Sequence, residues 1–285
     1  MKLINFQVGQ RKSCGVLANR GVVDLGARLG ERAGDVLSLL RADLIDQARK
    51  WAVSDGCDYR PAELRLLNPA GRCTRYFCIG VNYPDRNEEY RDGSERPKYP
   101  SLFMRTHTSF SAPGEPIVRP GESEQLDYEG EIALVIGRGG RRIRHDQALD
   151  HVFGYTCANE GSVRDWLRHS KFNVTQGKNF DRSGSLGPHI VTADEVGPDP
   201  LRVTTRVNGE IRQDDTSDRM IFPIPHLISY LSRFCTLEPG DVILTGTPSG
   251  AGARLHPPRY LVPGDRVEVE VSRVGLLSNE VIDEL

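Results

Sequence analysis

The sequence predicts an α+β protein in which strands predominate. Short apolar runs rich in β-branched residues recur along the chain, and Gly, Pro and Asn turns divide them. Helical periodicity is confined to a few segments, and helices do not alternate regularly with strands, which argues against a doubly wound parallel sheet. We expect a small α/β unit over residues 1–70 and a β-rich roll or barrel over residues 71–285.

The N-terminal unit begins with three expected strands, at residues 2–8, 13–17 and 21–25. Residues 34–53 carry apolar side chains at three-and-four spacing, which predicts one helix. Residues 61–69 start and end with proline and indicate an extended linker. The unit contains no cluster of chemically reactive side chains. We therefore interpret it as an appendage for packing or oligomerisation.

In the larger unit, apolar runs and turn residues predict most of the elements. A short helix is expected from Pro84, a brief one at residues 146–151, another starting at 162, and an amphipathic one over 225–234. Residues 91–100 and 176–188 indicate loops, and the first is of the kind that often forms a lid. Expected strands lie at residues 76–80, 101–105, 132–136, 152–158, 202–207, 210–213, 242–244 and 266–271.

Composition narrows the class of protein. The formal net charge is -2, so no basic footprint indicates binding to nucleic acid or to an anionic membrane. No apolar run is long enough for a membrane span, and the first residues lack the apolar core of a signal peptide. The six cysteines are scattered without a CxxC pair, as expected for free thiols in a reducing compartment. We expect a cytoplasmic protein.

One stretch, residues 127–137 (DYEGEIALVIG), carries the first chemical signal. Strand side chains alternate, so Glu129 and Glu131 share a face, and both faces beyond them are apolar. Two buried carboxylates are costly unless they are paired or bind a cation, and a hard divalent cation suits them. The alternative is that the strand reaches the surface there and both are solvated. Glu160 adds a third carboxylate at a strand-to-helix junction.

Several ordered segments together resemble the fumarylacetoacetate hydrolase family. Their order and spacing agree with that family over roughly residues 72–285, whereas any single segment would be weak evidence. The resemblance implies the mixed β-roll or barrel of that family for the larger unit. The segments are 78–83 (CIGVNY), 127–137, 153–155 (FGY), 159–165 (NEGSVRD), 177–181 (GKNFD), 207–210 (VNGE) with Gln213, 237–241 (LEPGD), 245–248 (TGTP) and 263–265 (PGD).

The resemblance implies a metal site and an active-site lysine. The family's metal ligands fall on Glu129, Glu131 and Glu160, where many relatives have aspartate in place of the last. An all-carboxylate set suits Mg²⁺ or Mn²⁺, with Ca²⁺ as an alternative. The family's lysine falls on Lys178. The arginine and aspartate at residues 164–165 are expected to be largely structural and to orient the metal shell.

The chain departs from the family at the position of the water-activating base. Many family hydrolases carry a histidine after the Asn-Tyr motif, paired with a glutamate three residues on. Here these positions are Arg86 and Glu89. Arginine stays protonated in proteins and cannot act as a general base. Glu89 or Glu88 alone acts as the base, or His107 substitutes, or the enzyme does not hydrolyse in the usual way.

The resemblance implies a metal-dependent hydrolase that cleaves a C–C bond of a β-diketo acid: an acylpyruvate, a fumaryl- or maleylpyruvate, or a diketo sugar acid. A metal-bound enolate would be the leaving group, with Lys178 stabilising the oxyanion. Arg105 and Arg86 are candidates to bind a remote substrate carboxylate, a structural ion pair being the alternative for Arg105. Tyr83 and Thr247 are further substrate-binding candidates, with a turn that only sets the backbone as the alternative for Thr247.

Other activities stay open within this resemblance. The missing histidine favours an isomerase of the 2-hydroxyhepta-2,4-diene-1,7-dioate type or a decarboxylase, because neither needs a hydrolytic water. A lyase acting on related oxo acids is a third branch, and a non-catalytic relative is a fourth. The family also implies a homodimer and a role in aromatic catabolism.

Overall fold

The computed structural model describes residues 1–53, 56–71, 73, 75–89, 95–167, 169–170 and 173–285. Within these ranges the largest sheet has eleven strands in the order β3-β2-β1-β13-β11-β10-β16-β5-β6, with β4 added to β1 and β7 to β13. Its strands are β1 Lys2–Val8, β2 Arg11–Ala18, β3 Gly21–Asp24, β4 Arg65–Leu67, β5 Tyr76–Gly80, β6 Ser101–Arg105, β7 Phe110–Ser111, β10 Gly130–Ile136, β11 Val152–Asn159, β13 Gly184–Thr192 and β16 Val242–Leu244.

A smaller sheet runs in the order β15-β14-β17-β18-β8, and β12 pairs with β9. The hairpin between β14 and β15 turns at Asn208 and Gly209, which have φ values of 52° and 80°, as a two-residue turn with Asn-Gly requires. These strands are β8 Ile117–Arg119, β9 Leu126–Asp127, β12 Ser162–Val163, β14 Arg202–Val207, β15 Glu210–Thr216, β17 Arg266–Val271 and β18 Gly275–Asp283.

The helices are short. The predicted helix over residues 34–53 is wrong as one element, because the chain turns at Asp43 (φ 56°) and divides it into α2 and α3. The predicted linker at 61–69 instead contains β4, which pairs with β1. The α-helices are α1 Leu25–Leu29, α2 Val36–Arg41, α3 Ile45–Ala52, α4 Pro84–Glu88, α5 Thr175–Lys178, α6 Ala193–Val196 and α7 Ile224–Phe234.

Strand β10 lies inside the main sheet and is buried along its whole length. It pairs antiparallel with β11 on one side and β16 on the other. Ile132 and Leu134 pack into one apolar core, whereas Ala133 and Val135 pack into another. Both faces are therefore buried, as the sequence pattern predicted, and they meet two separate cores.

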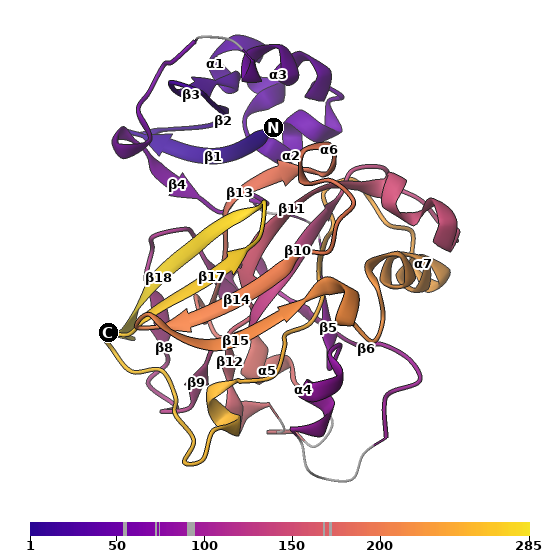
Figure 1. Cartoon of the computed structure of the whole chain (residues 1–285). Helices are drawn as coiled ribbons and strands as arrows, with labels where there is room; N and C mark the ends of the chain where they lie inside the picture. Colours follow the sequence, from indigo (N-terminus) through magenta and orange to yellow (C-terminus); the bar gives the residue numbers. More distant parts are fainter. Residues whose placement is uncertain (54–55, 72, 74, 90–94, 168, 171–172) are drawn as a thin grey trace.

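The main sheet continues through the N-terminal part of the chain. Lys2 and Leu3 of β1 pair with Val191 and Ile190 of β13. Leu3 also belongs to the same apolar core as Ala133 of β10. Figure 1 shows the N-terminal strands with α1, α2 and α3 at one end of the molecule. The expected unit over residues 1–70 thus shares a sheet and a core with the rest.

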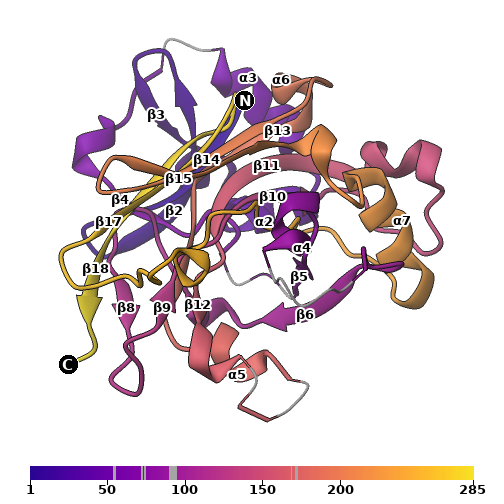
Figure 2. The same cartoon turned by 60° about the horizontal axis from the view of Figure 1, so that its bottom comes forward.

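The predicted α+β class with a majority of strands is confirmed. The sheets are open, with β3 and β6 at the two ends of the main one, and do not form the closed barrel that was one expectation. Among the described residues, no helix is both long and apolar enough to cross a membrane. Helices α4 and α5 and strand β12 gather at the same end of the sheets (Figures 1 and 2), and this end holds the candidate site.

Candidate active site

Three glutamates converge at the point where β10 begins and β11 ends. Glu129 precedes β10, Glu131 belongs to it, and Glu160 follows β11. The two strands pair with Gly130 opposite Asn159, and the Glu160 amide donates to the Glu129 carbonyl at 2.7 Å. One carboxylate oxygen from each glutamate lies within 4.8 Å of the others, and all three side chains are buried. The solvated alternative is therefore wrong for this strand end.

The glutamates differ in electrostatic environment. Burial, together with the charges of Glu160 and Glu129, raises the pKa of Glu131 well above its usual value. The Gly246 amide donates to its carboxylate at 2.8 Å, which is the one hydrogen bond described for that side chain. Burial alone would raise the pKa of Glu129 too, but nearby cations hold it well below the usual range. A hard divalent cation fits this set, because it would be the positively charged partner that is not described for Glu131.

Lys178 lies at the end of α5 and is buried, although an isolated lysine in such a loop is usually exposed. Its Nζ donates to Glu129 at 2.5 Å and to Glu160 at 2.6 Å. Burial lowers the pKa of Lys178, but the two carboxylates outweigh it, so the net shift is upward. Nζ also lies 5.1 Å from the centre of the Phe103 ring. The ammonium is therefore charged at neutral pH and sits among the candidate ligands.

Arg86 of α4 occupies the expected histidine position and reaches the site. Its Nη2 donates to Glu129 at 3.1 Å, and its Nη1 donates to Glu89 at 2.8 Å. The other Glu89 oxygen accepts the Gly250 amide at 2.6 Å. His107 lies exposed on the 3₁₀ turn His107–Ser109, and no contact between it and the three glutamates is among those described. The Glu88 side chain lies outside what the structure describes.

Comparison with known proteins identifies the family to which this chain belongs. Residues 75–282 match the family model described as Fumarylacetoacetate (FAA) hydrolase C-terminal. The chain belongs to this family. Its similarity to oxaloacetate tautomerase YisK of Bacillus subtilis is 41% identity over 228 residues, covering 78% of this chain and 75% of the relative. The mitochondrial oxaloacetate tautomerase FAHD2A of Homo sapiens is 39% identical over 223 residues, covering 78% and 70%.

Solved structures of the family give the same assignment. Maleylpyruvate hydrolase from Sphingobium sp. SYK-6, in complex with manganese(II) and pyruvate, superposes over the full length of both chains with a TM-score of 0.82 and 27% identity. The expectation of a fumarylacetoacetate hydrolase family member is thereby confirmed. The named relatives include tautomerases as well as a hydrolase, so the family alone does not assign the reaction.

The family's arginine at 164 reaches a candidate metal ligand, whereas no such contact is described for the aspartate beside it. Arg164 Nη2 lies 2.7 Å from Glu129 Oε1, and Arg164 Nε donates to Asp127 at 2.8 Å. Asp165 instead accepts the Ser123 hydroxyl at 2.6 Å. The contact of Arg164 with Glu129 is consistent with the expected orienting role, whereas no contact between Asp165 and the three glutamates is among those described. Asp127, which the sequence reasoning did not single out, takes the expected place of Asp165.

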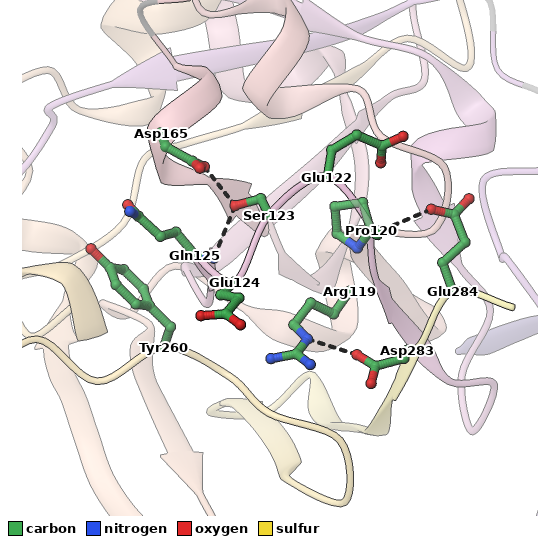
Figure 3. A pocket seen from close by; sticks show the side chains of 11 residues that line it. Arg119, Pro120, Glu122, Ser123, Glu124, Gln125, Asp165, Tyr260, Asp283 and Glu284 are labelled. Carbon is green, nitrogen blue, oxygen red and sulfur yellow. Dashed lines mark hydrogen bonds and ion pairs between the residues drawn. The ribbon is translucent and has the colours of Figure 1, made fainter.

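Asp165 belongs to a separate cavity of about 700 Å³, shown in Figure 3. None of the lining residues is one of the three glutamates or Lys178. The cavity is open and carries five carboxylates against one guanidinium. It is lined by Arg119, Pro120, Gly121, Glu122, Ser123, Glu124, Gln125, Asp165, Tyr260, Asp283 and Glu284.

Arg105 is wholly buried and holds Glu160. Its Nη1 donates to Glu160 Oε1 and to the Gly161 carbonyl, both at 2.8 Å. Its Nε and Nη2 donate to Ser109 and Ser183. The five N–H donors of a guanidinium are thus all engaged, and a substrate carboxylate would have to displace one of these partners. The contacts support the structural ion pair, and direct substrate binding by Arg105 stays a prediction.

The two other substrate-binding candidates lie close to the site and are buried. Tyr83 is fully buried, and its hydroxyl has no hydrogen-bond partner among the described residues. The Thr247 hydroxyl donates a hydrogen bond to the Gly130 carbonyl at 3.0 Å and accepts one from Gln213 Nε2 at 2.8 Å. The preceding Gly246 has φ 98°, which sets the turn that was the alternative role of this segment. Substrate binding by Tyr83 and Thr247 stays a prediction.

Proposed function

We propose that this member of the fumarylacetoacetate hydrolase family is a divalent-metal-dependent tautomerase, which interconverts the keto and enol forms of a short 2-oxo dicarboxylic acid of the oxaloacetate class. The two curated relatives at 41% and 39% identity are both named oxaloacetate tautomerases. Each is covered for 70% or more of its own length.

The observation that carries the proposal is Arg86. A hydrolase of this family needs a base that activates water, and a guanidinium cannot take up a proton at neutral pH. Arg86 is bound to Glu129 and Glu89, and His107 is exposed on a turn. Tautomerisation only moves a proton from a carbon to an oxygen and consumes no water. A site that has positively charged groups to stabilise an enolate, but has Arg86 where hydrolases of the family have the histidine, suits that reaction.

Glu129, Glu131 and Glu160 would hold the cation. Such a cation, when bound, polarises the carbonyl oxygen of a 2-oxo acid and stabilises the enolate charge. Lys178 remains protonated, because Glu129 and Glu160 raise its pKa, and it adds a second positive charge beside the reacting oxygen. These residues account for enolate stabilisation without a nucleophilic water.

We assign proton transfer to Glu89. Its carboxylate accepts a hydrogen bond from Arg86, and the same guanidinium donates to Glu129. A single side chain, that of Arg86, therefore connects Glu89 to the three glutamates. A positioned carboxylate transfers protons efficiently between carbon and oxygen when it is held at hydrogen-bond distance. The charge of Arg86, between Glu89 and Glu129, favours substrates that carry a second carboxylate. The proposed roles of Glu89 and Arg86 are supported by their positions, Arg86 within α4 and Glu89 directly after it.

C–C hydrolysis of a β-diketo acid, through the same enolate, is the second candidate. It is supported by the likeness to maleylpyruvate hydrolase, which was solved with manganese(II) and pyruvate. In this case Glu89 alone would activate the water. Decarboxylation of the same substrate class would differ from both in releasing carbon dioxide.

The experiment is a comparison of substrates with Mg²⁺ or Mn²⁺ present. We expect the protein to accelerate the decay of the enol absorbance of freshly dissolved oxaloacetate to its equilibrium value, without pyruvate or carbon dioxide release above the protein-free control. It should leave an acylpyruvate intact. Conversion of the acylpyruvate into pyruvate and an acid would instead establish the hydrolase. No acceleration with either metal would refute the tautomerase.

A further inference from the structure

Asp127 is a buried carboxylate whose bonds go to four different groups. It lies in β9 and is fully inaccessible to solvent. Oδ1 accepts the amides of Tyr128 and Gly252, both at 2.9 Å. Oδ2 accepts the Ala253 amide at 2.9 Å and Arg164 Nε at 2.8 Å. Each oxygen thus has two donors, and a buried charge with this many partners is held in one orientation.

One of these partners leads to the metal ligands. Arg164 places Nε on Asp127 and Nη2 at 2.7 Å from Glu129 Oε1. Because the guanidinium is planar and rigid, its contact with one carboxylate sets the direction in which it meets the other. The orientation of Arg164 toward Glu129 therefore depends on Asp127.

The other hydrogen-bond partners of Asp127 connect it to Glu89, directly after α4. The connection runs through the loop that includes the 3₁₀ turn Gly252–Arg254. Asp127 holds the amides at 252 and 253, and the Tyr128 hydroxyl donates to the Gly250 carbonyl at 2.9 Å. The Gly250 amide donates to Glu89 at 2.6 Å. A Cβ at Gly252 would lie 2.8 Å from Asp127 Oδ1, so the loop approaches the carboxylate closely only because glycine stands there.

The two series of contacts that start at Asp127 meet at one atom, Glu129 Oε1. Glu89 binds Arg86, and Arg86 donates to Glu129 Oε1, the same oxygen that Arg164 contacts. We infer that Asp127 is a positioning residue: through Arg164 it fixes the metal ligand Glu129, and through the 250–253 loop it fixes Glu89, which directly follows α4. This ring of bonds joins the metal ligand and the proton-transfer group of the proposed function.

The test uses Asp127→Asn in the full-length protein. Asparagine has the same size but presents an N–H either to Arg164 or to the loop amides, where the structure needs an acceptor. We expect the Kd for Mn²⁺, measured from free Mn²⁺ by electron paramagnetic resonance, to rise about 10- to 100-fold. In metal-free protein we expect amide hydrogen exchange to become about tenfold faster in residues 247–254 and in residues 84–89.

Asp165→Asn is the matched control, because this neighbouring carboxylate binds Ser123 in the cavity of Figure 3 and lies outside the ring. It should change neither measurement. In an Arg164→Gln background, Asp127→Asn should add no further rise in the Mn²⁺ Kd, since the effect passes through Arg164.

Unchanged exchange in residues 84–89, or additive effects of the Asp127 and Arg164 variants on the Kd, would overturn the inference. If Asp127→Asn does not fold, Arg164→Lys replaces it, because lysine keeps the charge but lacks the rigid planar fork that sets the direction of the contact with Glu129. A Kd equal to that of the wild type would then overturn it. Hydrogen exchange does not depend on metal binding, so a failure of the proposed function is distinguishable from a failure of this inference.

Discussion

Replacing Glu131 by Gln should make the metal-free protein more stable, although it removes a metal ligand. In the absence of metal the Glu131 carboxylate is buried and repelled by Glu160 and Glu129, which raises its pKa. Glutamine keeps an oxygen for the Gly246 amide, which donates at 2.8 Å, and removes the charge. The substitution therefore relieves an unfavourable charge and keeps an acceptor for the Gly246 amide.

The sign follows from the direction of the pKa shift. The folded protein binds this proton more tightly than the unfolded chain does, so wild-type stability falls as pH rises from the ordinary glutamate value through the raised one. We expect Glu131→Gln to raise the free energy of unfolding by about 1–2 kcal/mol at pH 7, a usual size for the effect of one substitution. The gain should shrink toward pH 4. Conversely, Mn²⁺ at 100 times its Kd should stabilise the wild type by about 2.7 kcal/mol, and the variant far less.

The assay is urea unfolding followed by circular dichroism, in EDTA and in Mn²⁺. Glu129→Gln is the matched control with the opposite sign, because Glu129 faces Arg86, Arg164 and Lys178. Its loss should cost about 3–5 kcal/mol in EDTA, since buried cations would lose their partner. If Glu131→Gln is less stable than the wild type in EDTA, or gains as much from Mn²⁺, the electrostatic reasoning is wrong.

Three further substitutions test other parts of the site. Arg86→His should pair a histidine with Glu89 and introduce acylpyruvate hydrolysis at about ten times the protein-free background or more, followed by loss of enol absorbance; a rate equal to that of the wild type would show that the dyad is not sufficient. Lys178→Met should lower kcat for tautomerisation about 100- to 1,000-fold with little change in KM, and an unaltered kcat would exclude it from the chemistry. Arg105→Lys should weaken Mn²⁺ binding in calorimetry about 10- to 100-fold through Glu160, whereas a raised KM at unchanged Kd would make Arg105 a substrate contact.

Local patterns predicted most strands but not every boundary. The alternation in β10 fixed which side chains face each core, because a strand with both faces buried has few alternatives. The helix over residues 34–53 fails at Asp43, whose positive φ has no glycine or proline to announce it. Part of the expected loop over 176–188 is instead the start of β13, since Gly187 and Pro188 interrupt a strand pattern without ending the strand. The expected lid over 91–100 lies partly outside the described residues.

The candidate site shows a similar division. Glu129 and Glu131 were identified by strand periodicity and Glu160 by its place at a strand-to-helix junction. Lys178 needed the family motifs, and so did the convergence of the glutamates, because that convergence depends on how β10 and β11 pair. The role of Asp127 was not predictable from its neighbours. Its loop partners lie 125 and 126 residues away along the chain, and no local pattern encodes such a contact.

The central claim is that the site moves a proton of a 2-oxo dicarboxylic acid and does not cleave its carbon chain. Proton NMR of oxaloacetate in D₂O, with Mg²⁺ and the wild-type protein, tests it directly. Enzyme-dependent deuterium incorporation at C3, without pyruvate formation above the protein-free control, is the predicted result. Unaccelerated exchange, or pyruvate appearing in step with the loss of substrate, would contradict the account.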